Sequence, residues 1–263
     1  LHIFLFFGAI KFFSIPIFKK PVLAVSVIAA FVAAIWLPFL LAKGMFMDGV
    51  GNALLAHNLA KGIGSFWAPE TIFYTNPQQW GTPPLGAAIL ANFYKAFGDF
   101  FYIEKIYSLL CGIIQLILIG CLWNLFFAND KLTQKYFWLP CVLWLLSPIV
   151  WWSYSNNMLE NTMSVFTTLS VITFATFRVL KKNLLVYSAV GACFIFLAVI
   201  TKGPTGLFPL ATPIIFLIEK NRLSTKQILA YTTLQFLFLC LICFVVFTQP
   251  AAHIFLNHYL FSN

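Results

Sequence analysis

Three ionisable side chains stand out in a sequence that has few of them: Asp48, Glu160 and Lys202. Each lies beside a long apolar run, and the whole chain holds only 7 acidic residues in 263. A carboxylate can act as a general base. A lysine next to free backbone N–H groups, as in "TKGPTG", can bind an anion such as a phosphate. Ionisable groups near a membrane are costly and commonly functional, so these three residues predict a reactive site.

Each of these residues also has a simpler interpretation. Asp48 could cap the helix that comes after it, and Glu160 could be a helix-start acid in a solvated turn. Lys202 could extend to the membrane interface without binding a ligand. Asn156 and Asn157 precede Glu160 in "NNMLENTM", a polar cluster that is unusual for this sequence, and they extend the candidate site.

The composition predicts the elements that must position these residues. The chain is 61% hydrophobic and 9% charged, with a mean hydropathy of +0.91, whereas a soluble domain carries about a quarter charged residues. We therefore expect an all-α, polytopic transmembrane bundle of about seven spans.

The net charge of +9 does not indicate nucleic-acid binding, because the basic residues lie in short groups between apolar runs. The six cysteines fall inside those runs and suggest neither a disulfide framework nor a metal site.

Hydropathy places the expected spans along the chain. A lead-in at 1–18 is predicted to lie at the membrane interface, and a turn region is predicted at 75–84. The seven predicted spans are 22–42, 107–127, 136–152, 162–180, 184–201, 203–218 and 227–248.

The distribution of charged residues assigns each end of this bundle to one side of the membrane. With seven spans, one side collects eleven of the 16 basic residues and two of the seven acids. The other side holds the remaining five basic and five acidic residues, among them Asp48, Glu160 and Lys202. By the positive-inside rule the first side is cytoplasmic, so the candidate site faces the extracytoplasmic side. The long connection at 43–105 lies on that side too, and its apolar periodicity predicts two helices lying on the membrane surface.

Four segments, in order, resemble the catalytic half of the GT-C membrane glycosyltransferases. They are "MDGVGNALLAHNLAKGIGSFWAPE", "WGTPPLGAAILANFYKAFGDFFYIEKIYSLLCG", "NNMLENTM" and "VITKGPTGLFPL". The likeness covers about residues 20–260. It is greatest to the bacterial branch that is similar to dolichyl-phosphate-mannose protein mannosyltransferases and to the lipid A aminoarabinose transferase.

The resemblance implies roles for particular residues. Asp48 corresponds to the catalytic acid of the first outer loop and Glu160 to a second acid after the third span. Lys202, Gly203 and Pro204 correspond to the family's "KGP" segment. Lys105 stands where these enzymes commonly carry an arginine, and we expect Lys105 and Lys61 to assist phosphate binding. The chain departs from the family pattern at Gly49, where a second polar or acidic residue is common, and at Thr82, where His or Lys is common.

The resemblance also implies an activity. The expected reaction transfers a sugar, with inversion, from a polyprenyl-phosphate-linked donor to a lipid, glycan or protein acceptor outside a bacterial plasma membrane. No cofactor is expected, and a divalent metal is possible but not required. The chain would be a single catalytic module (1–263), the N-terminal part of a longer enzyme. The alternatives are a transporter or flippase for a lipid-linked or anionic solute, which would need charges at mid-membrane depth, and a non-catalytic membrane subunit.

Overall fold

The computed structural model describes residues 21–71, 82–216 and 223–261. The predicted lead-in at 1–18 and most of the predicted turn at 75–84 lie outside these residues. Within the described ranges the chain is helical and contains no strand, apart from one isolated bridge between Gly64 and Pro69. The prediction of an all-α membrane bundle is therefore confirmed.

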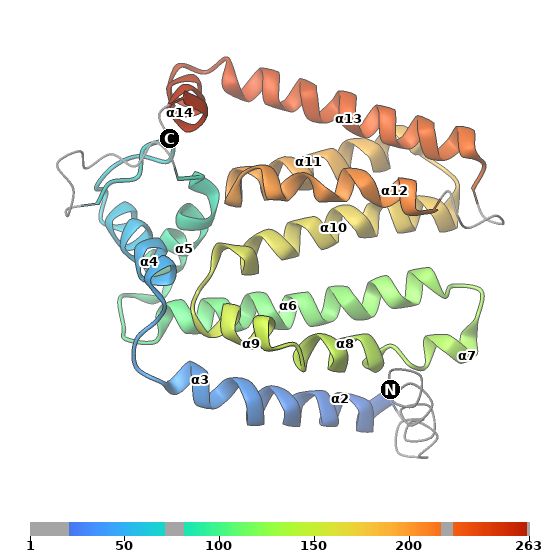
Figure 1. Cartoon of the computed structure of the whole chain (residues 1–263), viewed down its shortest axis with the longest axis horizontal. Helices are drawn as coiled ribbons and strands as arrows, with labels where there is room; N and C mark the ends of the chain where they lie inside the picture. The colour runs from blue at the N-terminus through green and yellow to red at the C-terminus, as the bar shows by residue number, and fades with distance from the viewer. Residues whose placement is uncertain (1–20, 72–81, 217–222, 262–263) are drawn as a thin grey trace.

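Four long helices form the body of the bundle. They are α6 (Ile103–Phe126), α10 (Leu159–Leu180), α11 (Leu184–Lys202) and α13 (Thr225–Phe247). With 19 to 24 residues each, at 1.5 Å per residue, they are long and apolar enough to cross the roughly 30 Å core of a membrane. Figure 1 shows them running alongside one another, with α10 between α6 and α11.

The first helix lies beside α6 and α8 and is continuous from residue 21 to 41. It consists of α2 (Pro21–Phe31), a π-helical turn η2 (Val32–Trp36) and α3 (Leu37–Leu41). Pro38 lacks the N–H that an α-helical hydrogen bond requires, and the π turn directly precedes α3. Trp36 from this turn is buried and stacks on Tyr154, with ring centroids 5.1 Å apart. Gly112 of α6 leaves room for the Trp36 ring, since a Cβ there would lie 2.3 Å from it.

Two of the predicted spans are not single α-helices. The span predicted at 136–152 is divided into α8 (Trp138–Leu145) and α9 (Pro148–Ser155). Ser147, between them, is extended because it precedes a proline. The span predicted at 203–218 begins as a 3-10 helix, η3 (Pro204–Ala211), followed by the short α12 (Thr212–Ile215). Prolines interrupt both segments by removing backbone donors.

Three further helices gather at one end of the bundle. They are α4 (Met47–Ala60), α5 (Pro84–Phe97) and α14 (Pro250–Phe261). At this end, on the left in Figure 1, α6 and α10 begin and α11 ends. We call it the cap end. Helices α4 and α5 are those predicted in the 43–105 connection, whereas α14 was not predicted. The opposite end carries the short α7 (Lys131–Gln134), which is capped by the side chain of Asp130.

Polar side chains join the long helices inside the bundle. Asn161 donates its Nδ2 to Ser108 on α6 and to the backbone of Ser153 on α9, at 2.7 and 3.0 Å. Deeper in the bundle, the hydroxyls of Thr173 and Tyr231 lie 3.0 Å apart and join α10 to α13. Such contacts satisfy polar groups that an apolar surrounding would otherwise leave without partners. They fix the start of α10, and therefore Glu160, relative to α6 and α9.

Candidate active site

A cavity of about 400 Å³ opens at the cap end. Its walls come from the first half of α4, the start of α10, the end of α11, and Thr71 and Thr82 of the connection between α4 and α5. The lining residues are Met47, Asp48, Gly51, Asn52, Leu55, Thr71, Thr82, Met158, Leu159, Glu160 and Lys202. The cavity thus unites the three ionisable residues singled out in the sequence.

Asp48 lies in the first turn of α4 and is exposed. The N-cap of this helix is Phe46 and not Asp48, so the capping interpretation of Asp48 is wrong. The side chain that serves this helix end belongs to another segment: Asn156 Oδ1 accepts the Phe46 N–H at 2.6 Å. Asp48 is therefore available to the cavity, and its charge suits the positive end of the α4 dipole.

The backbone at Gly49 fits closely against the turn that precedes α10. A Cβ at this position would lie 1.8 Å from the carbonyl oxygen of Asn156. Glycine is therefore required here by the close approach of two backbones. The departure from the family pattern at position 49 has a steric cause, since a second acidic side chain would not fit between α4 and this turn.

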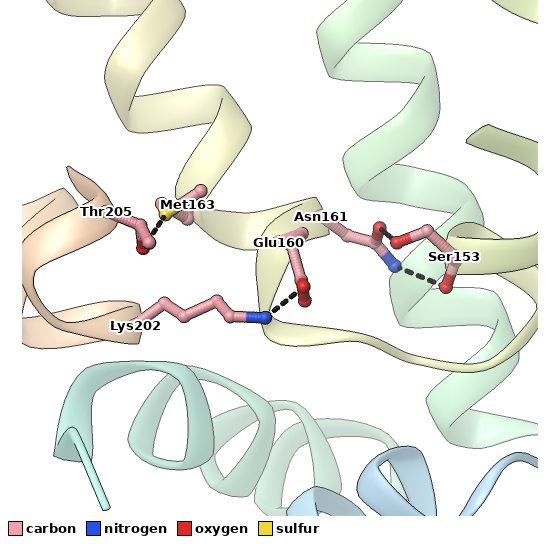
Figure 2. A network of polar contacts seen from close by, with 6 residues as sticks. All are labelled: Ser153, Glu160, Asn161, Met163, Lys202 and Thr205. Atoms are coloured by element: carbon pink, nitrogen blue, oxygen red, sulfur yellow. Dashed lines mark hydrogen bonds and ion pairs between the residues drawn. The ribbon is translucent and has the colours of Figure 1, made fainter. Parts of the chain in front are cut away.

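Glu160 and Lys202, which both line the cavity, form an ion pair with each other (Figure 2). Glu160 stands in the first turn of α10 and Lys202 is the last residue of α11. The Lys202 ammonium contacts Glu160 Oε1, while Glu160 Oε2 is buried and has no hydrogen-bond partner among the described residues. The two side chains remain 42% and 30% exposed, so the pair borders the cavity and is not part of the core.

The backbone around Lys202 is tightly held. Gly203 has φ +85° and its N–H donates to Val199 O at 2.6 Å, which ends α11. The Tyr259 hydroxyl of α14 occupies the place that a Cβ of Gly203 would need, 2.1 Å from that position. Thr205, on η3, contacts the sulfur of Met163 on α10 at 3.4 Å, as Figure 2 shows. These contacts fix the backbone from which the Lys202 side chain extends to Glu160.

The other predicted site residues lie apart from this cavity. Lys105 is buried and donates its ammonium to the carbonyls of Phe39, at 3.2 Å, and Ala42. It lines a neighbouring cavity of about 330 Å³, together with Asn156. Lys61 is exposed at the far end of α4.

Asn157 is buried in the turn before α10, with φ +51°, and its Nδ2 has no hydrogen-bond partner among the described residues. It does not line the larger cavity either.

The cavity also includes residues that the sequence reasoning did not select. Asn52 lies one helical turn after Asp48 and so shares its face. The i, i+4 spacing of Asp48 and Asn52 could have indicated from the sequence that Asn52 shares this face. Thr71 and Thr82 line the cavity from the connection between α4 and α5. Their position depends on the packing of that connection, which the sequence does not reveal.

Two outer contacts brace the helices of the cap end. His57 on α4 and Asp99, after α5, lie 2.8 Å apart. The Tyr94 hydroxyl on α5 donates to Glu104 at the start of α6. Burial raises the pKa of Tyr94 above its usual value, and the neighbouring Glu104 carboxylate raises it further. Tyr94 therefore remains a neutral donor.

Among the described residues, no group of three or more His, Cys, Asp or Glu side chains forms a potential metal site.

Comparison with solved structures identifies the fold. Two crystal structures of ArnT from Cupriavidus metallidurans match the chain with a TM-score of 0.66 each. In the apo state the identity is 13%, over 91% of this chain and 44% of ArnT. In the structure bound to undecaprenyl phosphate it is 12%, over 90% of this chain and 43% of ArnT. No protein-family model matches the sequence, and no curated protein matches it significantly.

The likeness at this level of identity concerns the fold. The chain shares the fold of ArnT over about nine-tenths of its length, and it spans less than half the length of ArnT.

Proposed function

We propose that the chain is a catalytic module of an integral-membrane glycosyltransferase. It would transfer a sugar from a polyprenyl-phosphate-linked donor to an acceptor hydroxyl or amine. The observation that carries this proposal is the meeting of Asp48, Glu160 and Lys202, from three separate segments, on one cavity at the cap end. The ArnT fold supports it, because one ArnT structure holds undecaprenyl phosphate and ArnT is the lipid A aminoarabinose transferase.

The chemistry requires few groups. A phosphate leaves readily, so no general acid is needed, in contrast to the paired carboxylates of glycosidases. Asp48 would accept the proton of the acceptor as it attacks the anomeric carbon from the face opposite the phosphate, which inverts the configuration. Lys202 would neutralise the departing phosphate. Glu160 would orient the acceptor. Asp48 is exposed to the cavity, as a base that meets an incoming substrate must be.

The proposal assigns phosphate neutralisation to Lys202 in preference to the other two lysines. The Lys105 ammonium already donates to two backbone carbonyls. Lys61 stands at the opposite end of α4 from Asp48. Asn156 contributes indirectly, by holding the start of α4 through Phe46. The departure at Thr82 places a neutral hydroxyl in the cavity, which leaves Lys202 as the cation among the described lining residues.

The proposed location is the bacterial plasma membrane, with the cap end outside. The charge asymmetry supports this orientation, because the basic residues concentrate at the ends of the spans opposite the cap end. The donor lipid would then present its phosphate to the cavity that Lys202 lines. The proposal covers a lipid, a glycan or a protein as the acceptor.

The test is the Asp48→Asn substitution in the full-length enzyme. Transfer from a radiolabelled polyprenyl-phosphate sugar should fall by at least about 100-fold, as for the loss of a general base. Expression and donor binding should stay near those of the wild type. Asp99→Asn is the matched control, because it removes a carboxylate from the cap end outside the cavity. Near-normal turnover of the Asp48 variant would refute the assignment, and vectorial movement of the lipid without product would favour the transporter alternative.

A further inference from the structure

We propose that Lys202 and Glu160 are an exchangeable pair that orders substrate binding. The phosphate of the donor lipid takes the Lys202 ammonium from Glu160, and the released Glu160 carboxylate then receives the acceptor. The donor therefore binds first. This inference rests on the proposed function and deepens it by assigning a sequence of events to the same cavity.

In the structure the Lys202 ammonium is already paired with the Glu160 carboxylate. Lys202 contacts Glu160 Oε1 (Figure 2). Both residues line the cavity that Asp48 also lines. An anion that enters must therefore compete with a carboxylate for the ammonium. The competition is feasible, because the two side chains are 30% and 42% exposed and a partly exposed ion pair is weak.

The second oxygen of Glu160 is suited to receive the acceptor. Oε2 is buried and has no hydrogen-bond partner among the described residues. A buried acceptor atom without a donor is unfavourable, and a hydroxyl or ammonium group of an acceptor substrate would supply one. Oε2 is shielded while the pair is intact, so an acceptor reaches it only after Lys202 turns to the phosphate and the carboxylate rotates, which also frees Oε1. Glu160 then presents two vacant acceptor positions beside Asp48, which is the arrangement that an incoming hydroxyl or amine requires.

The surroundings restrict the exchange to side-chain rotation. Gly203, with φ +85° and the Tyr259 hydroxyl against it, fixes the backbone at the end of α11. Asn161, next to Glu160, is buried and bonded to Ser108 and Ser153. Neither helix end needs to shift for the ammonium to leave the carboxylate. The pair is a contact between two anchored backbones, and the lysine has the longer flexible side chain of the two.

Equilibrium binding of undecaprenyl phosphate to the detergent-solubilised full-length protein tests the exchange. Glu160→Gln removes the competing charge and should tighten binding about two- to five-fold, the range that corresponds to a partly exposed ion pair. Lys202→Ala should weaken it by roughly tenfold. The double variant should match Lys202→Ala alone, because Glu160 acts on the lipid only through Lys202. Asp99→Asn, the control, should leave the affinity unchanged.

Steady-state kinetics separate the exchange from a structural role of Glu160. In Glu160→Gln the KM for the donor should fall while the KM for the acceptor rises. A fold defect would not move the two constants in opposite directions.

The outcomes distinguish this inference from the proposed function. If Glu160→Gln leaves undecaprenyl phosphate binding unchanged or weakens it, the exchange is wrong. If transfer in that case still depends on Asp48, the proposed function holds without the exchange. If the wild-type protein neither binds the lipid nor transfers a sugar, the proposed function fails and the exchange fails with it.

Discussion

The backbone carbonyl of Asn156 lies where the Cβ of any residue other than glycine at position 49 would have to be. Two segments more than a hundred residues apart therefore meet backbone to backbone, directly behind Asp48. The Asn156 side chain completes the junction by accepting the Phe46 N–H and donating to Trp152 O at 2.8 Å. The position of the proposed base relative to Glu160 is set at this junction.

The first prediction concerns this contact. Gly49→Ala should destabilise the protein by about 1–3 kcal/mol, the usual cost of overpacking, and lower transfer by separating α4 from the turn before α10. Gly51→Ala in the same helix is the control, because a Cβ there meets nothing within 4 Å. That change should be neutral or stabilise by up to about 1 kcal/mol through helix propensity. Thermal unfolding in detergent measures both, and equal melting temperatures for the two variants would contradict the contact.

The second prediction separates Lys105 from Lys202. Because Lys105 donates to the carbonyls of Phe39 and Ala42, Lys105→Ala should cost about 1.5–3 kcal/mol of stability. Undecaprenyl phosphate binding, measured well below the melting temperature, should change less than twofold. Lys43→Ala, an exposed neighbour in the same small cavity, should be nearly neutral in both assays. A large loss of lipid affinity in the Lys105 variant would assign the phosphate to the smaller cavity instead.

The third prediction concerns the end of α11. Gly203→Ala combines a backbone at φ +85° and ψ −153°, a region that essentially only glycine adopts, with a clash against the Tyr259 hydroxyl. The backbone strain alone costs about 1–3 kcal/mol. The variant should lose stability and also weaken lipid binding, because Lys202 is displaced. Adding Tyr259→Ala should relieve the clash and leave the strain, so recovery should be partial. Complete recovery would mean that the backbone conformation is unimportant.

The fourth prediction concerns metal dependence. The proposed scheme gives the neutralising charge to Lys202 and the proton to Asp48, so no metal-dependent step is needed. Dialysis against EDTA should therefore leave turnover within about twofold of the untreated enzyme. Re-addition of Mg²⁺ or Mn²⁺ to the treated enzyme is the control. A loss of activity that the metal restores would place an ion between the carboxylates and require a different scheme.

Much of the architecture was readable from hydropathy and charge. Apolar runs of the right length predicted α6, α10, α11 and α13, because a membrane span needs about 20 apolar residues. The turn and helix signals of the 43–105 segment predicted α4 and α5. The division at Pro148 was not recognised, although a proline within a predicted span is a helix-breaking signal. Helix α14 was missed, since a short apolar segment after a span has no distinctive periodicity.

The site was only partly readable, and for a physical reason. Local patterns place Asp48, Glu160 and Lys202 at span ends, but which span ends become neighbours depends on helix packing. The same limit applies to Lys105. Its charge suggested a phosphate ligand, whereas its hydrogen bonds go to carbonyls 63 and 66 residues earlier. Asn156 was selected for its polarity, and its amide joins two backbone segments.

The contact between Tyr259 and Gly203 has a consequence for biosynthesis. Residues 47–60 leave the ribosome long before residue 259, yet the turn that carries Lys202 is completed only when α14 packs against it. During translation the earlier spans would be inserted while the end of α11 that carries Lys202 is still open. A nascent chain arrested just before α14 should therefore be membrane-integrated and unable to bind the lipid. Competence would be acquired when α14 packs, after α13 has entered the bilayer.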